Sequence, residues 1–170
     1  MELSIIEDLR VLAQIAITLI GFTGIIGVLQ SRGGNVLTSH EKLHLVGLLM
    51  FSSLVILLAF VPGWIFLLPD IENKEWTWII RILFLVHIAA WLVAYPVLAS
   101  GGMLLRKFPL VDRIGASVVS LIGVTAVVAE AFILFGFYES YSPVLYESVL
   151  LFFLGSGLFN FMRLLLLPLK

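Results

Sequence analysis

The sequence contains no cysteine, and only 12% of its 170 residues are Asp, Glu, Lys or Arg. The absence of cysteine excludes disulfides, thiol catalysis, iron–sulfur clusters and Cys-ligated zinc. A typical soluble domain carries roughly 25% charged residues, and half that share cannot cover the surface of a soluble globule. The formal net charge is only −1, which argues against a nucleic-acid-binding protein with a basic surface.

The residues that are present are mostly apolar, with 61% hydrophobic residues and a mean hydropathy of +1.15. A bilayer core about 30 Å thick needs a helix of roughly 20 apolar residues. Five stretches reach that length, and short polar turns separate them. The sequence therefore predicts an all-α integral membrane protein, a single polytopic domain over residues 1–170 with five transmembrane helices. The predicted spans are about residues 9–29, 43–68, 78–105, 114–138 and 143–167.

The basic and acidic residues are sorted between the two sides of this predicted bundle. Most bases fall on one side, namely Arg32, Lys42, Arg106, Lys107, Arg113 and Lys170. Most acids fall on the other side, namely Glu2, Glu7, Asp8, Asp70, Glu72, Glu75, Glu139 and Glu147. Because cytoplasmic loops are enriched in Lys and Arg, we expect the N-terminus outside and the C-terminus in the cytoplasm. The acidic N-terminus lacks the basic region of a signal peptide, so the first span is expected to be retained. We expect a multi-pass protein of the bacterial inner membrane.

The first predicted span carries a polar stripe on one helical face. At 100° per residue, Glu7, Arg10, Gln14 and Thr18 share this face, together with Gly21. One interpretation is a hydrophilic wall that lines a path for ions. The other is a helix interface with interhelical hydrogen bonds, in which the charged residues sit among the headgroups.

Glu130 is the most informative residue, because no other charge lies within a helical turn of it. It shares a face with small residues, which indicates that it points toward a close neighbour rather than lipid. A carboxyl in this position must pair with a cation or stay protonated. His87 of the third span lies at a similar depth and Arg81 somewhat shallower, and these two residues are the candidate partners. The pair is either structural, fixing helix register, or handles protons or cations.

A second polar strip lies in the predicted cytoplasmic half. Ser117 and Ser120 follow Arg113 in the fourth span, and Asn160 and Arg163 follow Ser156 in the fifth. These side chains either line a cytoplasmic vestibule, or they form interhelical hydrogen bonds while the arginines extend toward the headgroups.

His40 and His44 are spaced four residues apart at the start of the second span, with Glu41 beside them. This spacing is compatible with a metal ion, but it departs from the His-Glu-x-x-His motif and no third ligand is evident. No nucleophile with a positioned base is recognisable either. We therefore expect no metal, no cofactor and no catalytic residues, and hence no enzyme.

These features predict a small homo-oligomeric channel or transporter that conducts cations or protons along its polar helix faces. Its partners would be the lipid bilayer and further copies of itself, and no nucleic acid. The pore or ion-handling candidates are Glu130, His87, Arg81, Gln14, Thr18, Glu7 and Arg10. The cytoplasmic-side candidates are Ser117, Ser120, Asn160 and Arg163. The alternative is a non-catalytic scaffold, sensor or accessory subunit that binds another membrane protein through helix contacts.

Overall fold

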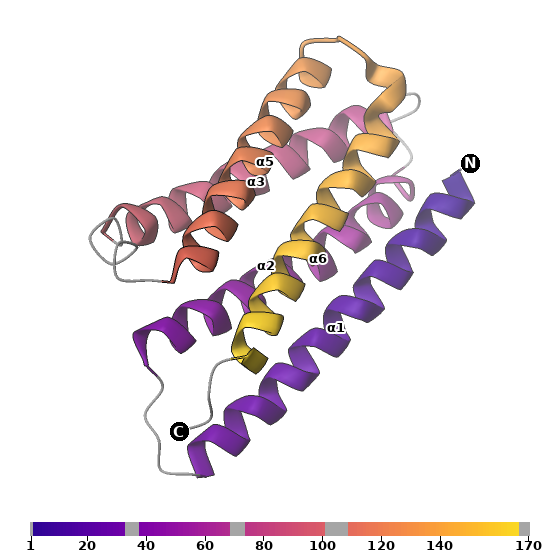
Figure 1. Ribbon diagram of the computed structural model, residues 1–170. Coiled ribbons are helices and arrows are strands. Elements are labelled where there is room, and N and C mark those ends of the chain that lie inside the picture. Colours follow the sequence, from indigo (N-terminus) through magenta and orange to yellow (C-terminus); the bar gives the residue numbers. More distant parts are fainter. Residues whose placement is uncertain (1, 33–37, 69–73, 101–108, 167–170) are drawn as a thin grey trace. The chain divides into compact units, whose positions relative to one another are not determined.

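The computed structural model describes residues 2–32, 38–68, 74–100 and 109–166, and these ranges contain five α-helices and no strand. The helices are α1 (Glu2–Arg32), α2 (Ser39–Ile65), α3 (Glu75–Ser100), α5 (Leu110–Leu134) and α6 (Ser142–Leu166), as shown in Figure 1. A short 3-10 helix, η1 (Glu139–Tyr141), precedes α6. All five α-helices are long and apolar enough to cross a membrane. The all-helical architecture predicted from the sequence is thus confirmed.

The helices extend beyond the apolar stretches at several ends. α1 covers residues 2–32 rather than 9–29, because polar residues at the end of a span can remain helical. α2, α3 and α5 each begin three or four residues before the predicted start, as comparison of 39, 75 and 110 with 43, 78 and 114 shows. Residues 101–105 and 167, which were predicted to close the third and fifth spans, lie outside the described residues.

A capping box sets the start of α2. The Thr38 amide donates to Glu41 Oε2 at 2.6 Å, and the Glu41 amide donates to Thr38 Oγ1 at 3.2 Å. The two side chains thereby satisfy amide groups that the first helical turn cannot pair internally. This exchange explains why the helix starts at Ser39, ahead of the apolar run.

A glycine motif ends α5 at Leu134, four residues before the predicted limit at residue 138. Gly136 has a φ of +86°, its amide donates to Ile133 O, and the Phe137 amide donates to Phe132 O. These two bonds form a Schellman motif, which satisfies the last helical carbonyls. The Phe132 and Phe137 rings pack at 6.0 Å, providing the apolar contact that accompanies this motif. Hydropathy alone could not reveal this stop, since the residues around Gly136 are aromatic.

The chain divides into two compact units, the first comprising residues Met1–Trp64 and Glu147–Lys170. This unit contains α1, nearly all of α2 and most of α6. In Figure 1, α6 lies beside α1 and α2, and α2 runs opposite in direction to both. Aromatic pairs join the helices, with Phe22 of α1 near Phe161 and Phe51 of α2 near Phe153. The buried residues of this unit include Leu9, Ala16, Leu48, Val55, Leu150 and Phe153.

The second unit spans Ile65–Tyr146 and consists mainly of α3 packed against α5. The two helices run antiparallel (Figure 1). Trp76 at the start of α3 packs edge-on against Phe66 and Tyr146. Ile79, Ile80 and Leu83 contribute a fully buried face of α3, and Ile133 of α5 is also buried. This interface positions the polar pair described next.

Candidate functional site

His87 of α3 and Glu130 of α5 form a buried pair. His87 Nδ1 lies 2.8 Å from Glu130 Oε1, within hydrogen-bond distance. The side chains are 2% and 0% exposed, respectively, so neither group reaches solvent or lipid. The carboxyl group can accept a proton from the imidazole, and it can donate one when it is itself protonated. The sequence indicated that Glu130 points at a close neighbour, and the structure places α3 there.

A glycine in the same interface allows α3 and α5 to approach each other closely. Gly123 lies two turns before Glu130 on α5 and is buried. A Cβ built at Gly123 would lie 3.0 Å from Trp91 Cζ2, tighter than most real contacts. Trp91 follows His87 by one turn of α3 and therefore occupies the space that Gly123 leaves. The aromatic residue thus packs against α5, and the absence of a side chain at Gly123 helps His87 and Glu130 to meet.

The second carboxyl oxygen of Glu130, Oε2, forms no hydrogen bond with the described residues, although the atom is buried. An unpaired buried polar atom is costly, and such atoms are uncommon in native proteins. A purely structural carboxylate is normally satisfied at both oxygens. The unpaired oxygen distinguishes this carboxyl group from one that is held at both oxygens.

Arg81, the other candidate partner of Glu130, lies elsewhere on α3. Its side chain is exposed, and its guanidinium carbon lies 4.8 Å from the centre of the Trp78 ring. This geometry is that of a cation–π contact at the surface of the helix. Of the two partners considered for Glu130, the hydrogen bond goes to His87.

The polar stripe of the first helix lies on the surface of its unit. Glu7, Arg10, Gln14 and Thr18 are all exposed, as is Gly21. The Thr18 hydroxyl donates to the Gln14 carbonyl at 2.8 Å within the helix, which satisfies that donor locally. The Gln14 amide group is exposed in the interior of a candidate span that covers Ser4–Gly27. Its exposure leaves the stripe available to another helix.

The cytoplasmic-side candidates have separate environments. Ser117 is exposed and donates to the Arg113 carbonyl at 2.9 Å, while Ser120 is half-buried. Arg163 is also half-buried. Hydrogen bonding of a hydroxyl to the carbonyl four residues earlier lets a serine stay in an apolar helix without another partner.

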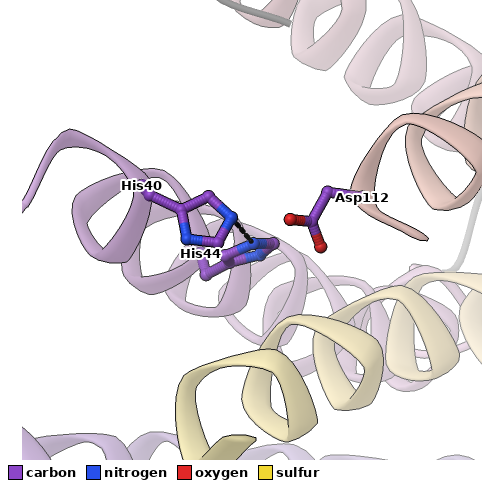
Figure 2. A group of neighbouring side chains, drawn as sticks. All are labelled: His40, His44 and Asp112. Carbon is purple, nitrogen blue, oxygen red and sulfur yellow. Dashed lines mark hydrogen bonds between the residues drawn. The ribbon is translucent and has the colours of Figure 1, made fainter. Parts of the chain in front are cut away.

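Asn160 of α6 connects to a residue that the sequence did not link to it. His44 Nδ1 lies 2.8 Å from Asn160 Oδ1, and Asn160 Nδ2 donates to the Ser156 carbonyl at 2.8 Å. His44 Nε2 in turn lies 3.2 Å from His40 Nε2 (Figure 2). A separation of 116 residues hides the His44–Asn160 contact from any local pattern. The structure explains the glycine at position 47, where a Cβ would lie 3.0 Å from Asn160 Oδ1.

Comparisons of this chain with protein-family models, with curated proteins and with solved structures find no match. The function must therefore be argued from the chemistry of the residues themselves.

Proposed function

We propose that this chain is a small homo-oligomeric membrane protein that conducts protons or small cations, with the His87–Glu130 pair as its ion-handling centre. The observation that carries the proposal is the 2.8 Å contact between two almost fully buried ionisable groups on neighbouring spans. Ionisable side chains inside a membrane are expensive and commonly mark ion paths and proton relays.

The chemistry of the pair suits a proton relay. An imidazole exchanges protons near neutral pH, and a carboxyl group beside it provides a second site for the same proton. Glu130 Oε2 has no hydrogen-bond partner among the described side chains, so it supplies a position for an entering proton or cation. Both side chains are almost fully buried, so a hydrogen bond between them is stronger than it would be in water.

The exposed stripe of α1 supports the homo-oligomer. Burying Gln14 against lipid would leave a primary amide without hydrogen bonds, which is unfavourable in hydrocarbon. A second copy of the same helix offers both a donor and an acceptor, since the glutamine amide is self-complementary. Gly21 and Gly24 lie near the other end of the candidate span, and a Cβ at either would meet nothing within 4 Å. Small residues of this kind let two helix backbones approach closely.

The same face also supports the alternative role of a scaffold or accessory subunit, in which α1 binds a different membrane protein. The two roles differ in what α1 contacts. Cross-linking through a photoreactive residue at position 14 in native membranes would give a dimer of this chain under the first role. A cross-link to another protein, with none between copies, would favour the second.

The charge distribution supports an orientation with the N-terminus outside and the C-terminus in the cytoplasm of a bacterial inner membrane. In this orientation the loop between α5 and α6, which carries Glu139, faces outward. Acidic residues concentrated on the outer side would raise the local concentration of cations near the entrance.

Proton flux in proteoliposomes tests the proposed function. Purified protein is reconstituted with an internal pH-sensitive dye, and a potassium gradient with valinomycin sets the membrane potential. We expect flux above empty liposomes for the unaltered chain and a loss of about tenfold or more for Glu130→Gln, since general acid–base groups contribute factors of 10² or more to proton transfer. Glutamine keeps the size of the side chain and can still accept a hydrogen bond from His87, but it cannot exchange a proton.

Glu139→Gln is the matched control, because it removes a carboxyl group from an exposed position outside the pair. This variant should keep most of the flux, because the other outer acids and the His87–Glu130 pair remain. A parallel assay with sodium or potassium in place of the proton gradient separates proton from cation conduction. Liposomes that conduct neither protons nor these cations above background at any voltage, or a Glu130→Gln variant with full flux, would refute the proposal.

A further inference from the structure

The two histidines at the start of α2 present a second cluster, separate from the His87–Glu130 pair. His44 is 4% exposed and His40 is half-buried. Their Nε2 atoms face each other at 3.2 Å, and the two rings meet edge to face at an interplanar angle of 85° (Figure 2). The four-residue spacing places both side chains on one face of the helix.

Asn160 fixes which nitrogen of His44 carries a proton. The Ser156 carbonyl can only accept, so the Asn160 amide nitrogen must face it, and Asn160 Oδ1 must face His44. His44 Nδ1 is therefore the donor in the 2.8 Å contact with Asn160. In the neutral imidazole the lone pair is then on Nε2, the atom directed at His40. This is the arrangement typical of metal-binding histidines, whose second ring nitrogen donates to an oxygen that orients the ring.

The separation of the two Nε2 atoms matches a shared metal ion. Zinc binds imidazole nitrogen at about 2.0–2.1 Å in tetrahedral geometry, which places two nitrogen ligands roughly 3.3 Å apart. The observed 3.2 Å agrees with this spacing. We propose that His40 and His44 bind a divalent transition metal ion of the zinc class through their Nε2 atoms, with Asn160 as a positioning residue.

The surroundings are consistent with a site built for this role. Glu41 lies beside the histidines, and its carboxylate accepts the Thr38 amide in the capping box. Gly47, one turn beyond His44, leaves room for Asn160 to reach the histidine, because a Cβ there would lie within 3.1 Å of the Asn160 amide carbon and nitrogen. The Phe159 ring packs edge-on against His44 and shields it further.

Metal binding requires a change of tautomer at His40. When His44 donates from Nδ1, the 3.2 Å contact needs His40 to donate from Nε2. To bind a metal, neutral His40 carries its proton on Nδ1 instead, so that each Nε2 atom has a lone pair. Further ligands complete the coordination. The ion would tie the first turns of α2 together and, through the Asn160 contact, stabilise the packing of α2 against α6 in the first unit.

Titration with Zn²⁺ and Co²⁺ tests this inference. The full chain is purified in detergent with an affinity tag free of histidine, Zn²⁺ binding is measured by calorimetry, and Co²⁺ binding by visible absorption. We expect one ion per chain, a fall in affinity of at least tenfold for His40→Ala, and loss of the site in His44→Ala. Asn160→Leu should weaken binding by about tenfold to hundredfold while both ligands remain, as loss of a supporting hydrogen bond does in metal sites.

Two further variants keep the result interpretable. Glu139→Gln changes an exposed carboxyl group of η1 and should bind Zn²⁺ like the unaltered chain. His40→Ala changes a half-buried residue and should fold even if His44→Ala does not. The inference is overturned if the unaltered chain binds no Zn²⁺, or if His40→Ala binds it with unchanged affinity. The metal site and the proton-handling pair involve different residues, so failure of one leaves the other standing.

Discussion

His87 Nδ1 and Glu130 Oε1 lie 2.8 Å apart between α3 and α5. Because of this contact, the contribution of each side chain to the free energy of unfolding depends on the other. Replacing either by alanine leaves a buried polar group without its partner, which costs about 3–5 kcal/mol for a buried pair. The double variant should lose clearly less than the sum of the single losses, because it leaves no uncompensated group. Unfolding in mixed detergent micelles, followed by circular dichroism, gives the three free energies.

Arg81→Ala provides the control for this cycle. Its guanidinium contacts only an exposed tryptophan face among the interactions described for it, so the variant should lose about 1 kcal/mol or less. The result could instead show a strong coupling energy between Arg81 and Glu130, with additive losses for His87 and Glu130. The Glu130 carboxyl group would then be stabilised by Arg81 rather than by His87.

Gly123 sets the distance between α3 and α5 at the height of Trp91. An added Cβ would lie 3.0 Å from Trp91 Cζ2, so the indole must shift or the helices must separate. Gly123→Ala should therefore destabilise the protein by about 1–3 kcal/mol, the usual cost of overpacking. It should also reduce proton flux, since the His87–Glu130 contact lies in the same interface.

Gly24→Ala is the matched substitution in α1, where nothing lies within 4 Å of the added Cβ. Alanine is the better helix former, by about 0.5–1 kcal/mol, so this variant should be as stable as the unaltered monomer or more stable. Equal destabilisation by both substitutions would contradict the packing described for Gly123.

Ser52 of α2 is fully buried, and its hydroxyl has no hydrogen-bond partner within the described parts of the chain. Ser52→Ala removes this unpaired group without creating a large cavity. Because a buried unpaired hydroxyl costs about 1–3 kcal/mol, the variant should be at least as stable as the unaltered protein in thermal unfolding. Ser156→Ala is the comparison, since its hydroxyl donates to the Phe152 carbonyl at 2.9 Å and should not gain stability. A clear loss for Ser52→Ala would indicate that the hydroxyl is bonded in the membrane.

The helices could be predicted because long apolar runs leave the backbone no alternative to internal hydrogen bonding in a bilayer. The helix ends were less accurate, because local bonds decide them. The capping box of Thr38 and Glu41 starts α2 early, and Gly136 ends α5 early within an aromatic stretch. Both signals are present in the sequence, but hydropathy does not detect them.

The candidate site was only partly predictable for a different reason. Helical periodicity placed Glu130 on a face of small residues, and depth selected His87 and Arg81 as its possible partners. Periodicity cannot choose between them, because the choice depends on how α3 rotates against α5. The contact of His44 with Asn160 joins residues 116 positions apart, and only the packing of α2 against α6 creates it.

The proposed orientation can be tested sharply because the chain has no cysteine. Single cysteines introduced at Glu139, between α5 and α6, and at Pro109, before α5, both fall at exposed positions at opposite ends of α5. The predicted topology places Glu139→Cys outside and Pro109→Cys in the cytoplasm, because the bases Arg106, Lys107 and Arg113 flank Pro109 in the sequence. In intact cells, a membrane-impermeant maleimide should label the first variant and spare the second, and permeabilised cells should allow labelling of both. The reverse pattern would place the acidic loops inside and invert the proposed direction of entry, since cations would then be concentrated on the cytoplasmic side.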